Sequence, residues 1–144
     1  YAKAYLDKHQ PNLIYIAYGE TDDFAHNGDY ESYIKSTRNS DSLIEDLWNY
    51  TQQSEYYRGE TTFIISTDHG RGTDPIDHWR SHGAKIKGSD QTWIIIFGKG
   101  VKTLGEVATN SQLHTNQLAP TVRKLFNLPQ KKEKGYGLPI PIND

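Results

Sequence analysis

The stretch 61-TTFIISTDHGRG-72 decides the fold and directs attention to one site. It begins with β-branched and apolar residues, which are typical of a buried strand, and runs on to Asp68, His69 and Gly70. In an extended chain the two polar side chains would point to opposite faces, but the glycine behind them permits a sharp turn that lets both face one cavity. The stretch therefore predicts a strand that presents two metal-binding side chains at its tip.

Two other segments have the composition of strands. The run 13-LIYIAY-18 is almost wholly apolar, and 92-TWIIIFG-98 is rich in β-branched and aromatic residues. Continuous apolar runs are typical of parallel strands that are covered on both faces. A short edge strand is also predicted near Leu138 to Ile142, in the proline-rich tail.

Helices are predicted between and around these strands. Apolar residues recur at three- and four-residue steps from about Tyr30 to Ser54 and from Thr115 to Phe126, and a shorter helix is expected from Ala2 to Lys8. Pro120 either belongs to the first turn of its helix or kinks it. The resulting order of strand, helix, strand, long loop, strand and helix predicts an α/β fold with a mainly parallel sheet and helices on both faces.

Composition limits the classes of function. The chain has 144 residues, of which 35% are hydrophobic and 24% charged, as expected for a globular domain with a core. Its 16 Lys and Arg against 18 Asp and Glu give a net charge of -2, so we expect no nucleic-acid-binding surface. No apolar run approaches the roughly 20 residues of a membrane span. The absence of cysteine excludes disulfides, thiolate metal sites and cysteine nucleophiles.

The start of the chain carries one further indication. The sequence opens on YAKAYLDKHQPN and contains no methionine. We interpret it as a piece of a longer polypeptide, and any targeting signal on the remaining piece would be absent here.

Asp and His residues concentrate at one end of the predicted sheet. They occupy the polar segments 19-GETDDFAHNG-28, 68-DHGRG-72 and 78-HWRSHG-83, of which the first two directly follow strands. The opposite ends of the strands, near Pro11, Gly59 and Gln91, carry no comparable cluster. Ligands of open parallel sheets gather beyond the carboxyl ends of the strands, so these three segments predict a site there.

The residue types indicate a metal centre. Asp22 and His26 are four residues apart, which places both on one face if their segment is helical. Asp and His without Cys favour zinc first and manganese second. Taken singly, TDD is a helix N-cap and DHG is a turn. Because three independent segments point to the same end of the sheet, the metal centre is the favoured interpretation.

These motifs resemble a known family. The order D-x-x-x-H at 22–26, D-H-G at 68–70 and a later H-G or H-T ahead of a glycine-closed apolar strand is similar to the C-terminal half of the alkaline phosphatase superfamily. That superfamily includes alkaline phosphatases, nucleotide pyrophosphatase/phosphodiesterases, sulfatases and cofactor-independent phosphoglycerate mutases. The resemblance extends from about Pro11 to Pro129 and includes the segment 119-APTVRKLFNLP-129.

The resemblance implies a centre with two divalent ions, most readily zinc and alternatively manganese. Asp22, His26 and a later histidine would bind the first ion, whereas Asp68 and His69 would bind the second. The second ion of the family is completed by an aspartate and a Ser or Thr nucleophile, both placed well upstream of the first motif. We therefore expect the nucleophile to lie outside this sequence.

Two assignments remain open between alternatives. The third histidine of the first site is His82, which precedes the strand as in the family, or else His114. Arg71, directly after the DHG turn, is the best local candidate for a clamp on the transferred group. The alternative is that Arg71 faces solvent or pairs with Asp74 or Asp77.

Residues 1–144 are thus expected to form the C-terminal part of a single alkaline-phosphatase-like catalytic domain. The implied function is hydrolysis of phosphoric mono- or diesters through two metal ions, with the isolated chain inactive. The alternatives are a sulfatase or phosphoglycerate-mutase-like member of the same superfamily, or a non-catalytic metal-binding domain.

Three expectations follow for the surroundings of the chain. The substrate is a phosphate or sulfate ester. An incomplete sheet leaves an apolar edge, so the chain packs against its missing N-terminal half or self-associates. Periplasmic or secreted placement is favoured by the family resemblance alone.

Overall fold

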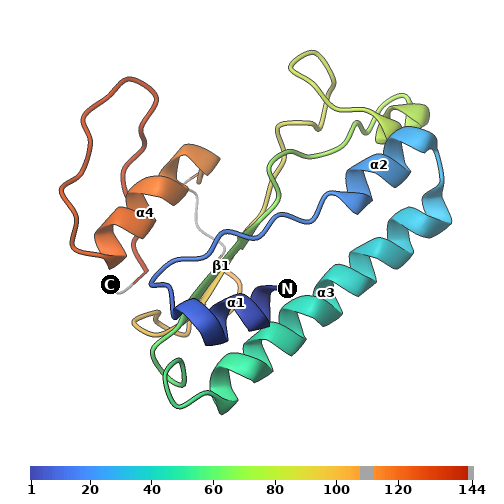
Figure 1. Ribbon diagram of the computed structural model, residues 1–144. Helices are drawn as coiled ribbons and strands as arrows, with labels where there is room; N and C mark the ends of the chain where they lie inside the picture. Colours follow the sequence, from blue (N-terminus) through green and yellow to red (C-terminus); the bar gives the residue numbers. More distant parts are fainter. Residues whose placement is uncertain (108–111, 143–144) are drawn as a thin grey trace. The chain divides into compact units, whose positions relative to one another are not determined.

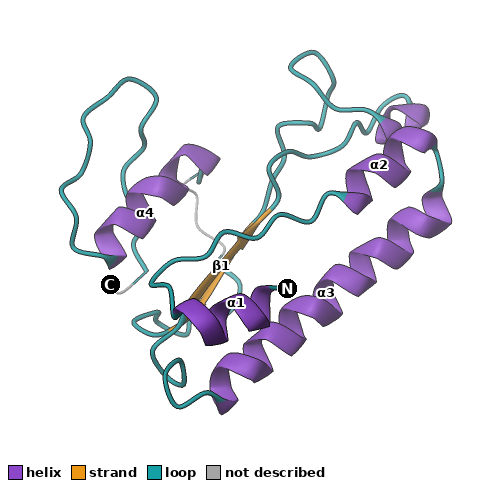
Figure 2. Ribbon diagram, in the orientation of Figure 1, coloured by secondary structure: helices purple, strands orange, loops and turns teal. Residues whose placement is uncertain are grey.

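A computed structural model of the chain describes residues 1–107 and 112–142, and the chain divides into two compact units. The first unit comprises Tyr1–Thr61 and His69–Gln91, and the second comprises Thr62–Asp68 and Thr92–Asp144. Each unit is therefore built from two separate stretches of sequence. Figure 1 follows the chain, and Figure 2 distinguishes its helices from its strands.

The first unit contains three α-helices: α1 (Ala2–His9), α2 (Glu20–Asn27) and α3 (Tyr30–Gln53). The two helices predicted at the start of the chain and after residue 30 are confirmed, and the D-x-x-x-H segment is helical as its spacing required. A sharp turn separates α2 from α3, and the two helices pack against each other (Figure 1).

Local chemistry explains the turn between α2 and α3. Gly28 ends α2 with φ 74°, a left-handed conformation that suits glycine. The Asp29 side chain then accepts a hydrogen bond of 3.0 Å from the Ser32 backbone N–H, which is the contact of an N-cap. The cap fixes where α3 begins, and so it fixes the turn that holds α2 against α3.

Helix α1 is tied to the C-terminal half of α3 by polar contacts over a small apolar core. Lys3 Nζ lies 2.5 Å from Asp46 Oδ2, and the Tyr50 hydroxyl donates to Asp7. That hydrogen bond raises the pKa of Tyr50 to about 12. Leu6 is buried beneath these contacts.

The predicted strand at 13–18 is not formed. This segment has no assigned secondary structure and pairs with neither of the two strands that the structure describes, and Leu13 and Tyr15 are exposed. A strand is stabilised by the hydrogen bonds of a neighbour, and an apolar run without one stays irregular. The pattern alone does not supply that neighbour.

The two strands of the second unit are β1 (Thr62–Ser66) and β2 (Ile94–Gly98), and they pair antiparallel with Thr62 opposite Gly98 and Ser66 opposite Ile94. The expectation of parallel pairing is wrong for these two strands. Parallel pairing needs a crossover, usually helical, that carries the chain back to the starting end of the sheet. The stretch between β1 and β2 instead holds only the short 3-10 helix η1 (Ile76–Arg80).

The loop between the strands folds back along itself within the first unit. Backbone hydrogen bonds join Gly70 N to Ser89 O at 2.8 Å and Gly72 N to Ser81 O at 3.1 Å. The segment that leaves β1 and the segment that leads into β2 thus run side by side in opposite directions. This path explains why β2 pairs with β1 in the antiparallel sense. The α/β character of the chain is retained, while the described residues contain no parallel pair of strands.

The last predicted helix is confirmed as a 3-10 turn, η2 (Thr115–Gln117), followed by α4 (Leu118–Leu125). Pro120 lies in the first turn of α4, so the helix is not kinked. The edge strand predicted at 138–142 is absent: Ile140 N–H donates instead to Thr121 Oγ1 at 2.8 Å. The tail therefore packs on α4 through a buried isoleucine.

Within the described residues, none of the helices combines the length and the apolar composition that a membrane crossing requires.

Candidate metal centre

Helix α2 presents Asp22 and His26 on one face. The two residues are one helical turn apart, and His26 Nε2 lies 3.4 Å from Asp22 Oδ2. The neighbouring Ala25 is fully buried, which anchors the helix with its polar face turned to the site. The four-residue spacing of Asp22 and His26 therefore places both side chains on the same face of α2, as predicted.

Two more histidines reach the same place from the loop that follows β1. The rings of His69 and His82 stack with centroids 3.7 Å apart and an interplanar angle of 12°. His69 Nδ1 lies 2.9 Å from the carbonyl oxygen of Gly70. Since a carbonyl oxygen only accepts, Nδ1 carries the proton, and in the neutral ring Nε2 is then the nitrogen that can ligate a metal ion.

The ligand atoms converge from three separate segments. One atom each from Asp22, His69 and His82 lies within 4.8 Å of the others. Asp22 Oδ1 lies 3.7 Å from His69 Nε2 and 3.6 Å from His82 Nε2, and His26 Nε2 lies 3.1 Å from His82 Nε2. Four ligands around zinc at its usual bond lengths would be about 3.3 Å apart. The donor types and their spacing therefore fit a divalent ion.

Arg71 dominates the electrostatics of the site. Its Nη2 pairs with Asp22 Oδ1, and its side chain is 17% exposed. Burial alone would raise the pKa of the Asp22 carboxyl, but the charge and hydrogen bond of Arg71, helped by His26 and His82, outweigh it and lower that pKa below its ordinary 3.8. Asp22 is accordingly ionised at neutral pH, as a metal ligand must be. Neither Asp74 nor Asp77 is the partner of this pair.

Two of the predicted residues, Asp68 and His114, belong to the second unit. Asp68 ends the first stretch of the second unit, whereas its neighbour His69 belongs to the first unit with Asp22. His114 is the N-cap of η2, and its backbone N–H donates to Gln117 Oε1 at 2.8 Å. His82, the preferred third histidine, lies beside Asp22, with Nε2 3.6 Å from Asp22 Oδ1. His69, which the sequence grouped with Asp68, also lies beside Asp22.

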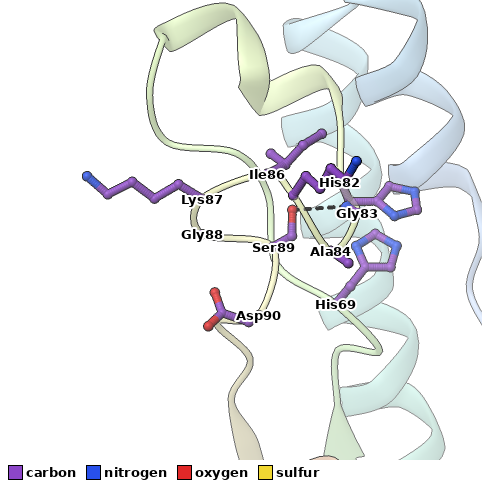
Figure 3. A pocket seen from close by; sticks show the side chains of 10 residues that line it. His69, His82, Gly83, Ala84, Ile86, Lys87, Gly88, Ser89 and Asp90 are labelled. Carbon is purple, nitrogen blue, oxygen red and sulfur yellow. Dashed lines mark hydrogen bonds between the residues drawn. The ribbon is translucent and has the colours of Figure 1, made fainter.

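The structure adds a cavity that the sequence did not reveal. His69 and His82 border a cavity of about 620 Å³ whose other wall is the turn 83–90. Figure 3 shows the two imidazole rings together at one side and Lys87 directed away from them. Ser89 Oγ accepts from Gly83 N–H at 3.1 Å and holds the turn closed. The two glycines at 83 and 88 were the only signal in the sequence for this turn.

Comparison with known proteins identifies the class. The model of the Metalloenzyme superfamily matches residues 1–130, and the chain belongs to that superfamily, within the alkaline phosphatase group. A 2,3-bisphosphoglycerate-independent phosphoglycerate mutase of Gloeobacter violaceus is 26% identical over 141 residues. The alignment covers 92% of this chain and 24% of the mutase, so the chain spans about a quarter of that relative's length. No solved structure matches the chain.

Proposed function

We propose that this chain is the metal-binding part of an enzyme that hydrolyses phosphoric mono- or diesters. The observation that carries the proposal is the convergence of one ligand atom each from Asp22, His69 and His82 within 4.8 Å, with His26 beside them. Membership of the Metalloenzyme superfamily supports it independently of the geometry.

The donor set favours zinc, with manganese as the second choice, because three imidazole nitrogens and one carboxylate suit a borderline ion. Such an ion polarises a phosphoryl oxygen and activates a hydroxyl nucleophile. The residues of the chain would position it: α2 supplies Asp22 and His26, and the long loop supplies His69 and His82. Asp68 is proposed as a ligand of a second ion.

The proposal also concerns the extent of the domain. Residues 1–144 are proposed to be the C-terminal part of a single catalytic domain, with the nucleophile on another part of the polypeptide. The alignment covers 24% of the mutase, so that relative has many residues outside the matched region. We expect the 144-residue chain to bind metal without turning over substrate.

Phosphoryl isomerisation is the second candidate function. It is supported by the name of the relative, a phosphoglycerate mutase that is similar over 92% of this chain. Sulfate ester hydrolysis and metal binding without catalysis are further alternatives within the same family. Turnover of an aryl phosphate, an aryl phosphodiester, an aryl sulfate or a phosphoglycerate by the longer parent protein separates the four.

The deciding experiment is metal content by elemental analysis after dialysis against trace zinc. We expect tightly held zinc in the wild-type chain, with loss of that metal in the variants Asp22→Ala, His69→Ala and His82→Ala. His114→Ala is the matched control, because His114 caps η2 in the second unit, and it should keep the metal. Equal zinc in all five proteins would refute the site.

A further inference from the structure

Arg71 pairs with the very oxygen on which the candidate ligands converge. Its Nη2 contacts Asp22 Oδ1, and that same oxygen lies 3.7 Å from His69 Nε2 and 3.6 Å from His82 Nε2. A positive charge therefore already occupies the neighbourhood that a metal ion would enter. Two cations this close repel each other strongly in a partly buried site.

The guanidinium is only partly satisfied in this position. The side chain is 17% exposed, and its Nη1 is buried and lacks a hydrogen-bond partner among the described residues. A buried donor without a partner is costly, and a charged one especially so. The pairing with Asp22 thus leaves a free donor that favours movement of the side chain toward another acceptor.

We propose that Arg71 is an internal counter-cation, which neutralises and orients Asp22 before metal binds and is displaced by the arriving divalent ion. The inference rests on the proposed metal site. It ascribes to Arg71 a role in metal loading that precedes any contact with substrate. Once displaced, the guanidinium has its donors free for an anionic oxygen of the phosphoryl type.

A purely structural role predicts the opposite effect on metal affinity. If the Arg71–Asp22 pair only held the loop against α2, its removal would loosen His69 relative to Asp22 and weaken metal binding. If Arg71 competes with the ion, its removal strengthens metal binding. The direction of the change therefore separates the two roles.

The test is zinc affinity measured by competition with a chromogenic chelator, without any assay of activity. For Arg71→Gln we expect an increase of about tenfold or more, because a positive charge close to the ion is removed. Arg71→Lys keeps the charge and is expected to bind zinc less tightly than Arg71→Gln. The matched control is Arg80→Gln, since Arg80 donates to the His26 carbonyl oxygen at 3.2 Å.

Each outcome is decisive. Unchanged or weaker zinc binding by Arg71→Gln overturns the inference while leaving the metal site in place. Equal strengthening by Arg80→Gln also overturns it, because the effect would then reflect net charge alone. If neither the wild type nor Arg71→Gln binds zinc, the proposed metal site itself fails. Should Arg71→Gln not fold, the uncharged variant Arg71→Met takes its place: zinc binding tighter than that of the wild type supports the inference, and unchanged or weaker binding overturns it.

Discussion

At the scale of single residues, Gly70 shows why the DHG turn needs glycine. We expect it to permit a sharp turn, and its φ is not among the positive values. A Cβ added to Gly70 would instead lie 2.3 Å from the carbonyl oxygens of both Gly88 and Gln91. Glycine is required at this position because the backbone of the loop segment 88–91 passes too close to Gly70 to leave room for a side chain.

Gly70→Ala should therefore destabilise the protein and displace its neighbour His69. The added methyl group meets backbone rather than a flexible side chain, so we expect a loss of about 1–3 kcal/mol in the free energy of unfolding. Urea denaturation measures it. Gly19→Ala is the control, because a Cβ there meets nothing within 4 Å. Equal effects of the two substitutions would contradict the explanation.

At the scale of elements, the placement of the site depends on how α3 begins. The hydrogen bond from the Ser32 N–H lowers the pKa of the Asp29 carboxyl below its ordinary 3.8. The ionised cap is therefore favoured in the folded chain. Its contribution to stability is fully present above pH 3.8 and is lost as the pH falls through the lowered pKa of the folded state.

Asp29→Asn keeps an acceptor oxygen but removes the charge at the N-terminus of α3. We expect the variant to be less stable than the wild type near neutral pH, and the two proteins to become equal below the lowered pKa. Urea midpoints followed by circular dichroism at several pH values test this. A difference that persists unchanged in acid would show that the charge of the cap does not matter.

At the scale of the whole molecule, the metal site joins segments that are far apart in sequence. Asp22 lies on α2, His69 follows β1 and His82 follows η1. An ion that binds all three only in the folded state stabilises it by mass action, by about 2.7 kcal/mol when the free ion is at a hundred times its Kd.

Zinc should accordingly raise the Tm of the wild type, and a chelator should reverse the increase. His82→Ala should show little or no increase, while His114→Ala should respond as the wild type does. Differential scanning calorimetry with and without zinc provides the measurement. A similar increase in His82→Ala would place the stabilising ion elsewhere.

The sequence determined the local features of the molecule. The three- and four-residue spacing of apolar residues gave the helices, because helical periodicity is a property of the chain alone. The i, i+4 spacing of Asp22 and His26 likewise placed both side chains on one face of α2. The motif order identified the family, which the match over residues 1–130 confirmed.

The tertiary structure decided how these pieces meet. The partner and direction of a strand depend on the path of the connecting chain, so neither the irregular segment 13–18 nor the antiparallel pairing of β1 with β2 could be predicted from apolar runs. For the same reason the position of His69 beside Asp22 could not be predicted from its sequence neighbours. Only the folded loop brings His69 and Arg71 to Asp22, because contacts between distant residues are set by packing and not by local spacing.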